Sequence, residues 1–444
     1  AKLQFLLQRE DLSLGSAGES VPHFFFSPSH QKVWVEPVKE GIKVDERHGR
    51  IYRGQLELSQ WNGKMAVINQ VPFEQYLYSV VSSELGQSWP MEALKAQAVA
   101  ARTYALQAGM KYQIAHVSDS TYDQVYKGMT VEFPEAVQAV DETRGEVLVN
   151  DEGLIAAFYF SNAGGMTADP SEIWGNPIDY VQSVPSPDEG AMEGLPFWYR
   201  IELSDGTLAY IHGDYVKETG QFTETGLPYV RVTEDRVNVR PAPYVDNINN
   251  APITQVNAGD QFVALEKTVQ SNPYFWIRGP YESLRVLEWI NPRLNEPISG
   301  ELKTLEVTRR GPSGRVLEIQ ANGKVLNVSS PDAYRAVFNS LPSTRLEIEE
   351  TGRVFIQSAD TVRDQVGTAE LAVLDSSGKT QSISQEMVYV IDGDGKWRPV
   401  TKKPQYRFIG YGFGHGIGLS QWGAKGLAEL GYDYQQILQY YFKD

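Results

Sequence analysis

The chain has 444 residues, more than one ordinary folding core, and a prior of roughly 150 residues per domain allows two or three domains. Its formal net charge of -16 argues against a broad phosphate-contacting surface, so nucleic acid is not an expected partner. The absence of cysteine excludes disulfides, thiolate nucleophiles and cysteine-ligated zinc. Only six histidines remain as nitrogen ligands, so we expect no metal and no other cofactor.

No segment approaches the ~20 apolar residues that a membrane span requires. The first residues, AKLQFLLQREDL, contain too short an apolar run for an export signal. If the protein is exported, we therefore expect its signal to have been removed. A diffusely acidic surface remains compatible with neutral or weakly charged substrates such as glycans.

Short apolar or alternating runs make the first 80 residues β-rich, and the expected strands lie at 33–39, 41–44, 51–61 and 64–69. The spacing then becomes helical over 71–85, and 89–109 is the clearest helix of the chain. Pro90 suits its first turn, and Gly109 can end it. One stripe of this helix predicts burial against another element, because its side chains are small or apolar: Leu94, Ala98, Ala101 and Ala105.

Strand-like runs return at 146–150 and 154–162, before a Gly-Gly turn at 164–165. Between 195 and 282 the chain has many short strands and turn residues without a helical pattern. We interpret this region as an inserted all-β module. Its patterns RVNVRPAP, AGDQFVALEK and YFWIRGPY are similar to those of bacterial SH3-like barrels.

Mixed α+β character resumes from about residue 300, with a hairpin whose turn is PSG at 312–314 and a short helix at 332–341. The predicted architecture is therefore an α+β domain whose sequence is split by the β module. Its first segment is 1–194, the SH3-like insert is 195–282, and its second segment is 283–444.

The motif GYGFGHGIG at 410–418 places glycine at every second position. In an extended chain the other residues project from one face: Tyr411, Phe413, His415 and Ile417. The bare glycine face could admit a sugar ring or another backbone, and the projecting face offers aromatic stacking and one imidazole. A nucleotide-binding loop is excluded, because no GK[ST] follows and the spacing is not GxGxxG. His415 alone would more often be a hydrogen-bonded structural histidine, and we assign it only to the binding cleft.

Ser420, Gln421 and Trp422 open the helix that follows this motif. We assign all three to substrate binding: Gln421 could bind a sugar by hydrogen bonds and Trp422 could stack on one, although Trp422 could equally belong to the core. In the terminal helix, Asp433 is the expected N-cap and Gln436 completes a capping box.

Five segments of the chain carry a resemblance to a known family. They are VPFEQYLYSVVSSELGQSWPMEALKAQAVAARTYAL (71–106), DSTYDQVYKG (119–128), FYFSNAGGMT (158–167), RRGPSGRV (309–316) and GYGFGHGIGLSQWGAKGLAELGYDYQQILQYYF (410–442). In this order they resemble the SpoIID/LytB family of cell-wall proteins, over most of 66–190 and 300–444. The resemblance implies a SpoIID-type mixed domain that acts on peptidoglycan.

By this resemblance Glu84, which precedes the alanine-rich helix, matches the catalytic acid of the family. Cleavage of a glycosidic bond needs a proton on the leaving oxygen, and a carboxylic acid kept neutral by burial can supply it. Glu84 follows an apolar run, which suits a partly desolvated carboxyl. Without the resemblance, a surface glutamate at a helix end would be the simpler interpretation.

A conventional glycosidase needs a second carboxylate about 5–9 Å away, and the sequence does not single one out. The candidates are Glu92, Asp123 and Glu172. The resemblance implies instead a lytic transglycosylase, in which the C6 hydroxyl of the substrate attacks the anomeric carbon and a 1,6-anhydro sugar forms.

Lys95 and Arg102 lie seven residues apart on one helix face, where they could hold glycan hydroxyls or a lactyl carboxylate. A solvated basic stripe would explain them about as well. The family resemblance favours substrate binding by both residues, and also by Tyr126.

Some family members bind zinc through Cys and His near the Gly-Gly turn, but this chain has FYFSNAGGMT there. We therefore do not expect zinc, and Asn162 or Ser161 could stabilise the turn by local hydrogen bonds.

The sequence thus predicts an extracytoplasmic enzyme that cleaves peptidoglycan glycan strands, including strands without stem peptides. One alternative is a non-catalytic amidase enhancer that binds glycan and activates a separate cell-wall amidase. Another is a wall-binding protein whose SH3-like insert recognises its ligand through exposed aromatics: Tyr244, Tyr274, Phe275 and Trp276. Core packing of the small barrel would explain these aromatics about as well.

Overall fold

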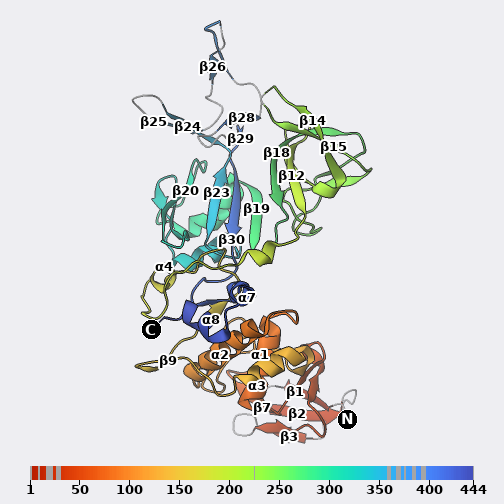
Figure 1. Ribbon diagram of the computed structural model, residues 1–444, viewed down its shortest axis with the longest axis vertical. Helices are drawn as coiled ribbons and strands as arrows, with labels where there is room; N and C mark the ends of the chain where they lie inside the picture. The colour runs from red at the N-terminus through yellow and green to blue at the C-terminus, as the bar shows by residue number, and fades with distance from the viewer. Residues whose placement is uncertain are drawn as a thin grey trace. The chain divides into compact units, whose positions relative to one another are not determined.

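The structure is a computed structural model that describes residues 3–8, 11–16, 24–26, 32–224, 226–357, 362–366, 372–374, 377–382, 387–391 and 397–443. Both α-helices and antiparallel strands are present, which confirms the α+β class (Figure 1). The chain divides into two compact units. Unit 1 contains residues up to Phe158 together with Leu427–Gln439, and unit 2 contains Tyr159–Gly426 and Tyr440–Lys443.

Three helices pack together in unit 1: α1 (Phe73–Glu84), α2 (Met91–Ala108) and α3 (Pro134–Glu142) (Figure 1). Pro90 precedes the first turn of α2, where a missing N–H costs nothing, and Gly109 ends the helix with a φ of 54°. The predicted stripe of α2 is buried, as expected: Leu94, Ala98, Ala101 and Ala105. Its small side chains allow the neighbouring helices to approach closely.

The strands that precede these helices confirm the β-rich start. An antiparallel sheet with the order β4-β7-β8 forms from β4 (Val33–Val35), β7 (Gln55–Trp61) and β8 (Lys64–Gln70). A separate pair consists of β5 (Ile42–Val44) and β6 (Arg50–Tyr52). At the N-terminus, a three-stranded sheet forms from β1 (Leu3–Gln8), β2 (Asp11–Ser16) and β3 (Phe24–Phe26).

The strands expected at 146–150 and 154–162 are shorter than predicted. Only two-residue ladders form, between β9 (Val149–Asn150) and β10 (Gly153–Leu154), and between β11 (Tyr159–Phe160) and β31 (Leu419–Ser420). Ile155 and Ala157 are nevertheless buried. The apolar pattern therefore indicated burial correctly, but a segment can be buried without pairing in a β-sheet.

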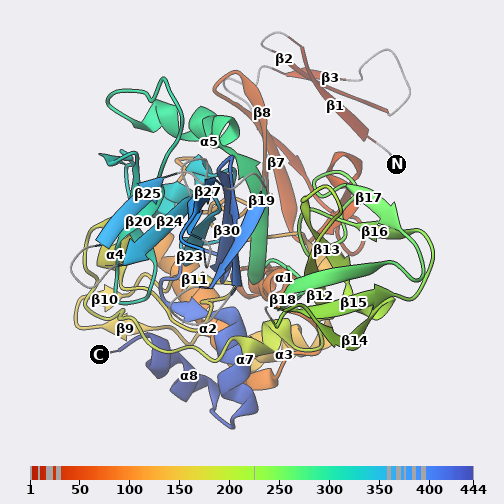
Figure 2. The same ribbon diagram turned by 90° about the horizontal axis from the view of Figure 1, so that it is seen from above.

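At the centre of unit 2 lies an antiparallel sheet with the order β19-β30-β23, formed by β19 (Phe275–Glu282), β30 (Gln405–Tyr411) and β23 (Leu346–Glu350) (Figure 2). Its core includes Trp276, Phe338 and Phe408, with apolar residues of α5 (Ser283–Ile290). The predicted hairpin around PSG is confirmed by β20 (Leu305–Arg310) and β21 (Val316–Ala321), which β22 (Lys324–Val325) extends. The helix expected at 332–341 is shorter, since α6 spans Tyr334–Val337 after a 3-10 turn at Pro331–Ala333.

The described residues between Phe197 and Val269 form strands, turns and one 3-10 turn, whereas the SH3-like assignment of this region stays a prediction. The main sheet has the order β13-β12-β18-β15-β14: β12 (Phe197–Glu202), β13 (Leu208–His212), β14 (Val216–Phe222), β15 (Pro228–Val232) and β18 (Gln261–Val269) (Figure 2). A second pair consists of β16 (Val237–Val239) and β17 (Thr254–Val256). These strands enclose a core of their own, with Ile201, Ile211 and Val230 fully buried.

The strand β19 was predicted inside the module, but it pairs with β30 of the central sheet. Trp276 is fully buried there, and a Cβ atom added to Gly410 would lie 2.1 Å from its ring. Glycine at 410 therefore lets the indole pack on the backbone of β30. This packing places Trp276 in the central core rather than on a ligand-binding surface of the module.

Three antiparallel pairs lie between β23 and β30: β24 (Arg353–Gln357) with β25 (Val362–Val366), β26 (Ala372–Leu374) with β27 (Thr380–Ser382), and β28 (Met387–Ile391) with β29 (Trp397–Thr401). The remaining helices are α4 (Pro170–Trp174), α7 (Gln421–Glu429) and α8 (Tyr434–Tyr441). The capping box of α8 is confirmed, because the Asp433 N–H donates to the Gln436 side chain and the Gln436 N–H donates to the Asp433 carboxylate.

The glycine-rich motif at 410–418 is not extended, so the prediction of one shared side-chain face is wrong. β30 ends at Tyr411, and Gly412, Gly414, Gly416 and Gly418 all have φ between 80° and 110°. Positive φ at every second residue breaks the alternation of side chains that a strand imposes. Phe413 is consequently 41% exposed, whereas Ile417 is fully buried.

Candidate functional site

Glu84 is the last residue of α1, and its side chain is half-buried. The backbone N–H of Val125 donates to its Oε1 across 3.3 Å. The next residue, Leu85, is buried and ends the helix in extended conformation. The position agrees with the partly desolvated carboxyl that the sequence predicted.

The residues around Val125 tie several elements of unit 1 together. Gln124 accepts a hydrogen bond from the Tyr76 hydroxyl (2.8 Å) and donates to the Ala101 carbonyl (3.1 Å), so it joins α1 to α2. The Lys127 N–H donates to the Ser79 hydroxyl of α1 (3.1 Å). The chain that contacts Glu84 is thus held on both of its sides.

Tyr126, a predicted substrate-binding residue, is 5% exposed. Its hydroxyl donates to Asn69 Oδ1 (2.6 Å), while the amide of Asn69 donates to the carbonyls of Arg53 and Gln55. Burial raises the pKa of Tyr126 above its ordinary value. Tyr126 therefore connects the Glu84 region to β8, and its ring is not open to a ligand.

Asp123 is the candidate second carboxylate nearest in sequence to Val125, and its side chain is fully enclosed. Burial opposes its ionisation, but hydrogen bonds from Lys111, Ser118 and Tyr112 outweigh burial and lower its pKa to about 2. The carboxylate is therefore ionised at any neutral pH.

The two other candidate carboxylates serve helix ends. Glu92 accepts from the Tyr434 N–H at the start of α8 (2.8 Å) and from Lys95 (3.2 Å). Glu172 is 5% exposed, closes the capping box of α4 and accepts from the Ser313 hydroxyl (2.6 Å). Both carboxylates therefore stabilise helix ends by hydrogen bonds.

Lys95 and Arg102 do share a face of α2, and this face packs towards α3. Lys95 forms ion pairs with Glu92 and Glu142, and the hydrogen bond to Glu142 is the main reason that its pKa is raised. Arg102 is 1% exposed and donates to both oxygens of Glu74 and to the carbonyls of Val140 and Glu146. These contacts occupy Arg102 inside unit 1, so we leave it out of the proposed substrate site.

In unit 2, His415 is held by the backbone. Its Nδ1 accepts the Ile417 N–H (3.0 Å), and a backbone hydrogen bond joins the ring to Tyr159. Desolvation lowers its pKa to about 4, assisted by the charges of Arg335 and Arg315 and opposed by Asp332. These hydrogen bonds are those expected of a structural histidine, while its assignment to the binding cleft stays a prediction.

Ser420 and Gln421 are also inside unit 2, at 0% and 4% exposure. The Ser420 hydroxyl donates to Asp188 Oδ1 (2.6 Å) and accepts the Gly423 N–H. Asp188 accepts in addition from the Gly165 N–H, and burial raises its pKa. Ser420 and Gln421 lack the exposure that direct sugar binding requires. We therefore leave them, like Arg102, out of the proposed substrate site.

Trp422 belongs to an aromatic cluster that the sequence did not predict, because its members come from distant segments. The Trp422 and Tyr274 rings lie 5.5 Å apart, and Tyr274 lies 6.5 Å from Phe413. Lys425 stands 5.4 Å from the Trp422 ring. Phe413 is exposed, and Tyr274 and Trp422 are half-buried. We name these three rings the aromatic cluster.

The Gly-Gly turn is stabilised locally, as predicted for Asn162. The Gly164 N–H donates to Asn162 Oδ1 (2.8 Å). Arg315 donates to the carbonyls of Ala163 and Met166, and burial lowers its pKa to about 10. Across the described ranges, no three or more His, Cys, Asp or Glu side chains gather where a metal ion could be held.

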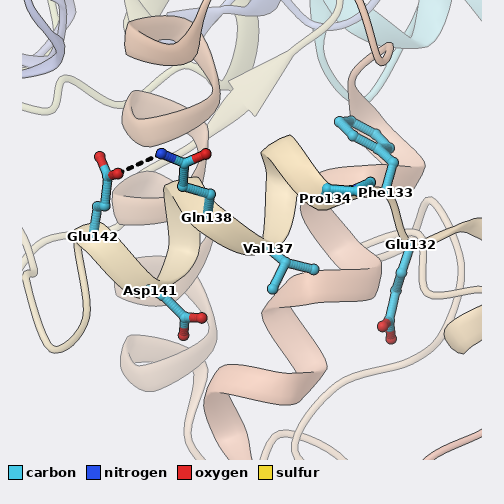
Figure 3. Close-up of a pocket in the computed structure, with 7 residues that line it drawn as sticks. All are labelled: Glu132, Phe133, Pro134, Val137, Gln138, Asp141 and Glu142. Carbon is cyan, nitrogen blue, oxygen red and sulfur yellow. Dashed lines mark hydrogen bonds between the residues drawn. The ribbon is translucent and has the colours of Figure 1, made fainter.

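A shallow pocket of about 680 Å³ lies on unit 1 beside α3 (Figure 3). It is lined by Glu132, Phe133, Pro134, Val137, Gln138, Asp141 and Glu142. Its acidic residues already have cationic partners within the chain: Arg53 binds Glu132, Arg144 binds Asp141, and Lys95 binds Glu142. Glu84 does not line this pocket.

In the part of the chain that the structure describes, no helix is long and apolar enough to cross a membrane.

The segment that contains Glu84 and the Asp123 loop matches a known family. Residues 61–150 match the family described as Stage II sporulation protein, SpoIID. An uncharacterized protein of Brachyspira hyodysenteriae is 36% identical over 154 residues, which cover 33% of this chain and 42% of the relative.

Two similar proteins of Bacillus subtilis have descriptive names. Its amidase enhancer is 25% identical over 373 residues, or 82% of this chain and 39% of the relative. Its stage II sporulation protein D is 31% identical over 137 residues, or 27% of this chain and 40% of the relative. The chain spans about two fifths of the length of each relative. The match over residues 61–150 and the names of these two relatives support the resemblance of the chain to the SpoIID/LytB family.

Proposed function

We propose that this protein is a peptidoglycan lytic transglycosylase in which Glu84 is the acid and base. The observation that carries the proposal is the half-buried carboxyl of Glu84 at the end of α1, oriented by the Val125 N–H within the segment that matches the family. Of the other carboxylates considered, Asp123 is enclosed, and Glu92 and Glu172 hold helix ends. A mechanism with one carboxylate is therefore favoured over one with two.

In this mechanism protonated Glu84 gives its proton to the glycosidic oxygen, and the bond between that oxygen and the anomeric carbon breaks. The C6 hydroxyl oxygen of the same muramic residue then bonds to the anomeric carbon. Its proton passes to the Glu84 carboxylate, which restores the acid. The intramolecular hydroxyl competes well with water because its effective molarity is high. The products are a 1,6-anhydro-muramic end and a free hydroxyl on the leaving sugar.

Two further elements support binding to the cell wall. The aromatic cluster of Tyr274, Phe413 and Trp422 offers ring faces on which sugars can stack. The β module over 197–269 has its own core and could act as an SH3-like wall-binding unit. The names of the relatives support an extracytoplasmic location at the wall.

Product analysis tests the proposal directly. Glycan strands freed of peptides by an amidase are incubated with the purified protein alone, and the products are identified by mass spectrometry. We expect 1,6-anhydro-muramic ends without new reducing ends. New reducing muramic ends would establish hydrolysis instead, and a second carboxylate would then be required.

The second candidate function is that of a non-catalytic amidase enhancer. The similarity to a protein named amidase enhancer, which covers 82% of this chain, favours it. In that case the protein binds glycan, forms no product alone and accelerates an added cell-wall amidase. If Glu84→Gln still accelerates the amidase, and neither the wild type nor the variant cleaves glycan strands, the protein is an enhancer.

A further inference from the structure

Asp123 has more hydrogen-bond donors than the sequence could indicate. Lys111 Nζ (2.5 Å) and the Tyr104 hydroxyl (3.2 Å) donate to its Oδ1. The Tyr112 hydroxyl and the Ser118 N–H, both at 2.8 Å, donate to its Oδ2. The donors come from the end of α2 and from the loop that follows it.

These contacts restrict what Asp123 can do chemically. An ionised carboxylate has about four lone-pair sites, and four donors occupy them. A general base or nucleophile needs a free lone pair and access to substrate, whereas the Asp123 side chain is 0% exposed. Asp123 therefore cannot act as the second carboxylate in this conformation.

The position of Asp123 in the chain gives it another role. It begins the five-residue segment 123–127, in which Gln124 is fixed to α1 and α2, and Tyr126 is fixed to Asn69. Val125 lies at the centre of this segment and directs its N–H at Glu84. Fixing the first residue of so short a segment also limits the movement of that N–H.

We propose that Asp123 is a positioning residue, which locks the segment 123–127 so that the Val125 N–H orients the Glu84 carboxyl. It acts through Val125 and touches no reacting atom. This inference rests on the proposed function of Glu84, and it gives the Asp123 carboxylate a role in loop geometry rather than in catalysis. A misplacement of about 1 Å at a catalytic group can cost roughly a hundredfold in rate.

The test is Asp123→Asn, which places an amide NH₂ against two of the four donors. We expect kcat for glycan cleavage to fall about tenfold to a hundredfold while KM changes less than about threefold. Hydrogen exchange of the Val125 amide, measured by NMR, should become at least about tenfold faster. Asp141→Asn is the matched control, because Asp141 accepts from Tyr78 and Arg144 on the exposed side of α3 and should change neither quantity.

Three results would overturn the inference. Unchanged kcat and exchange in Asp123→Asn would show that the loop does not depend on the carboxylate. Lost activity with unchanged exchange, together with hydrolytic products from the wild type, would show a directly catalytic Asp123. If Asp123→Asn does not fold, Tyr112→Phe removes one donor of the four, and it must still accelerate Val125 exchange and lower kcat by a few-fold.

The exchange measurement separates this inference from the proposed function, because it requires no activity. If the wild type cleaves no glycan while Val125 exchange responds to Asp123→Asn, the proposed function fails and the positioning role stands. If the wild type cleaves glycan and the variant matches it in rate and exchange, only the positioning role fails.

Discussion

Arg102 and Glu74 form a two-point ion pair that joins α2 to α1, with guanidinium nitrogens 3.1 Å and 2.8 Å from the two carboxylate oxygens. The same guanidinium donates to the carbonyls of Val140 and Glu146. One buried arginine thus satisfies acceptors from three parts of unit 1.

Arg102→Met should destabilise unit 1 strongly, because Glu74 and two carbonyls lose their donors. Removal of one partner from a buried pair costs about 3–5 kcal/mol. Arg144→Met is the control, since the Arg144–Asp141 pair is exposed to solvent and should contribute little to stability. Urea denaturation measures both; equal losses in the two variants would contradict the buried role of Arg102.

Glu84→Gln should lower glycan cleavage by at least about a hundredfold, because the amide cannot deliver a proton to the leaving oxygen. The melting temperature and glycan binding should be unchanged, since the amide oxygen can still accept the Val125 N–H. Release of 1,6-anhydro products is the measurement. Activity within a few-fold of wild type would remove Glu84 from the mechanism.

Phe413→Ala and Trp422→Ala should each weaken glycan binding by about threefold to tenfold, because each removes a ring from the aromatic cluster. Isothermal titration with peptide-free glycan oligomers measures the affinity. Trp34→Ala is the control, since Trp34 is 45% exposed on β4 and belongs to unit 1. Affinities that are the same in all three variants would rule out the cluster as a sugar platform.

His415 should make unit 2 less stable as the pH falls from about 6.5 to about 4. Its folded-state pKa is lowered to about 4, mainly by desolvation, so in this window the unfolded chain binds a proton that the folded chain does not. Stability therefore rises with pH across the window and levels off above it. His415→Gln should reduce this slope relative to wild type in denaturation at several pH values, and parallel pH profiles would contradict the assignment.

Deletion of residues 197–270 should leave a folded remainder. The ends of this segment are already adjacent, because the Gln270 N–H donates to the Pro196 carbonyl across 2.8 Å. The segment also has its own core. Arg407 of β30 keeps its ion pair with Glu349 of β23 after the deletion, because both residues lie outside the segment.

A deletion that continues through Glu282 provides the comparison, because it also removes β19 from the central sheet. It should abolish cooperative unfolding, which circular dichroism during heating can follow. If both deletions unfold the protein, the β module is part of the main core.

The sequence by itself determined the features that depend on neighbouring residues. Proline before α2 and glycine after it set the helix bounds, because both act on local backbone geometry. The PSG hairpin, the capping box of Asp433 and Gln436, and the link from Asn162 to its turn were predicted for the same reason. The position of Glu84 came from a contiguous motif.

Only the tertiary structure decided which surfaces became interior. The spacing of Lys95 and Arg102 correctly indicated a shared face, but α3, which begins at Pro134, covers it. β19 looked like part of the module, yet it pairs with β30 more than a hundred residues later. In the sequence Asp123 was a candidate second carboxylate, whereas in the structure four hydrogen-bond donors surround it. Hydrophobic burial is non-directional and strand pairing is non-local, so a sequence pattern shows that a face will be covered without showing what covers it.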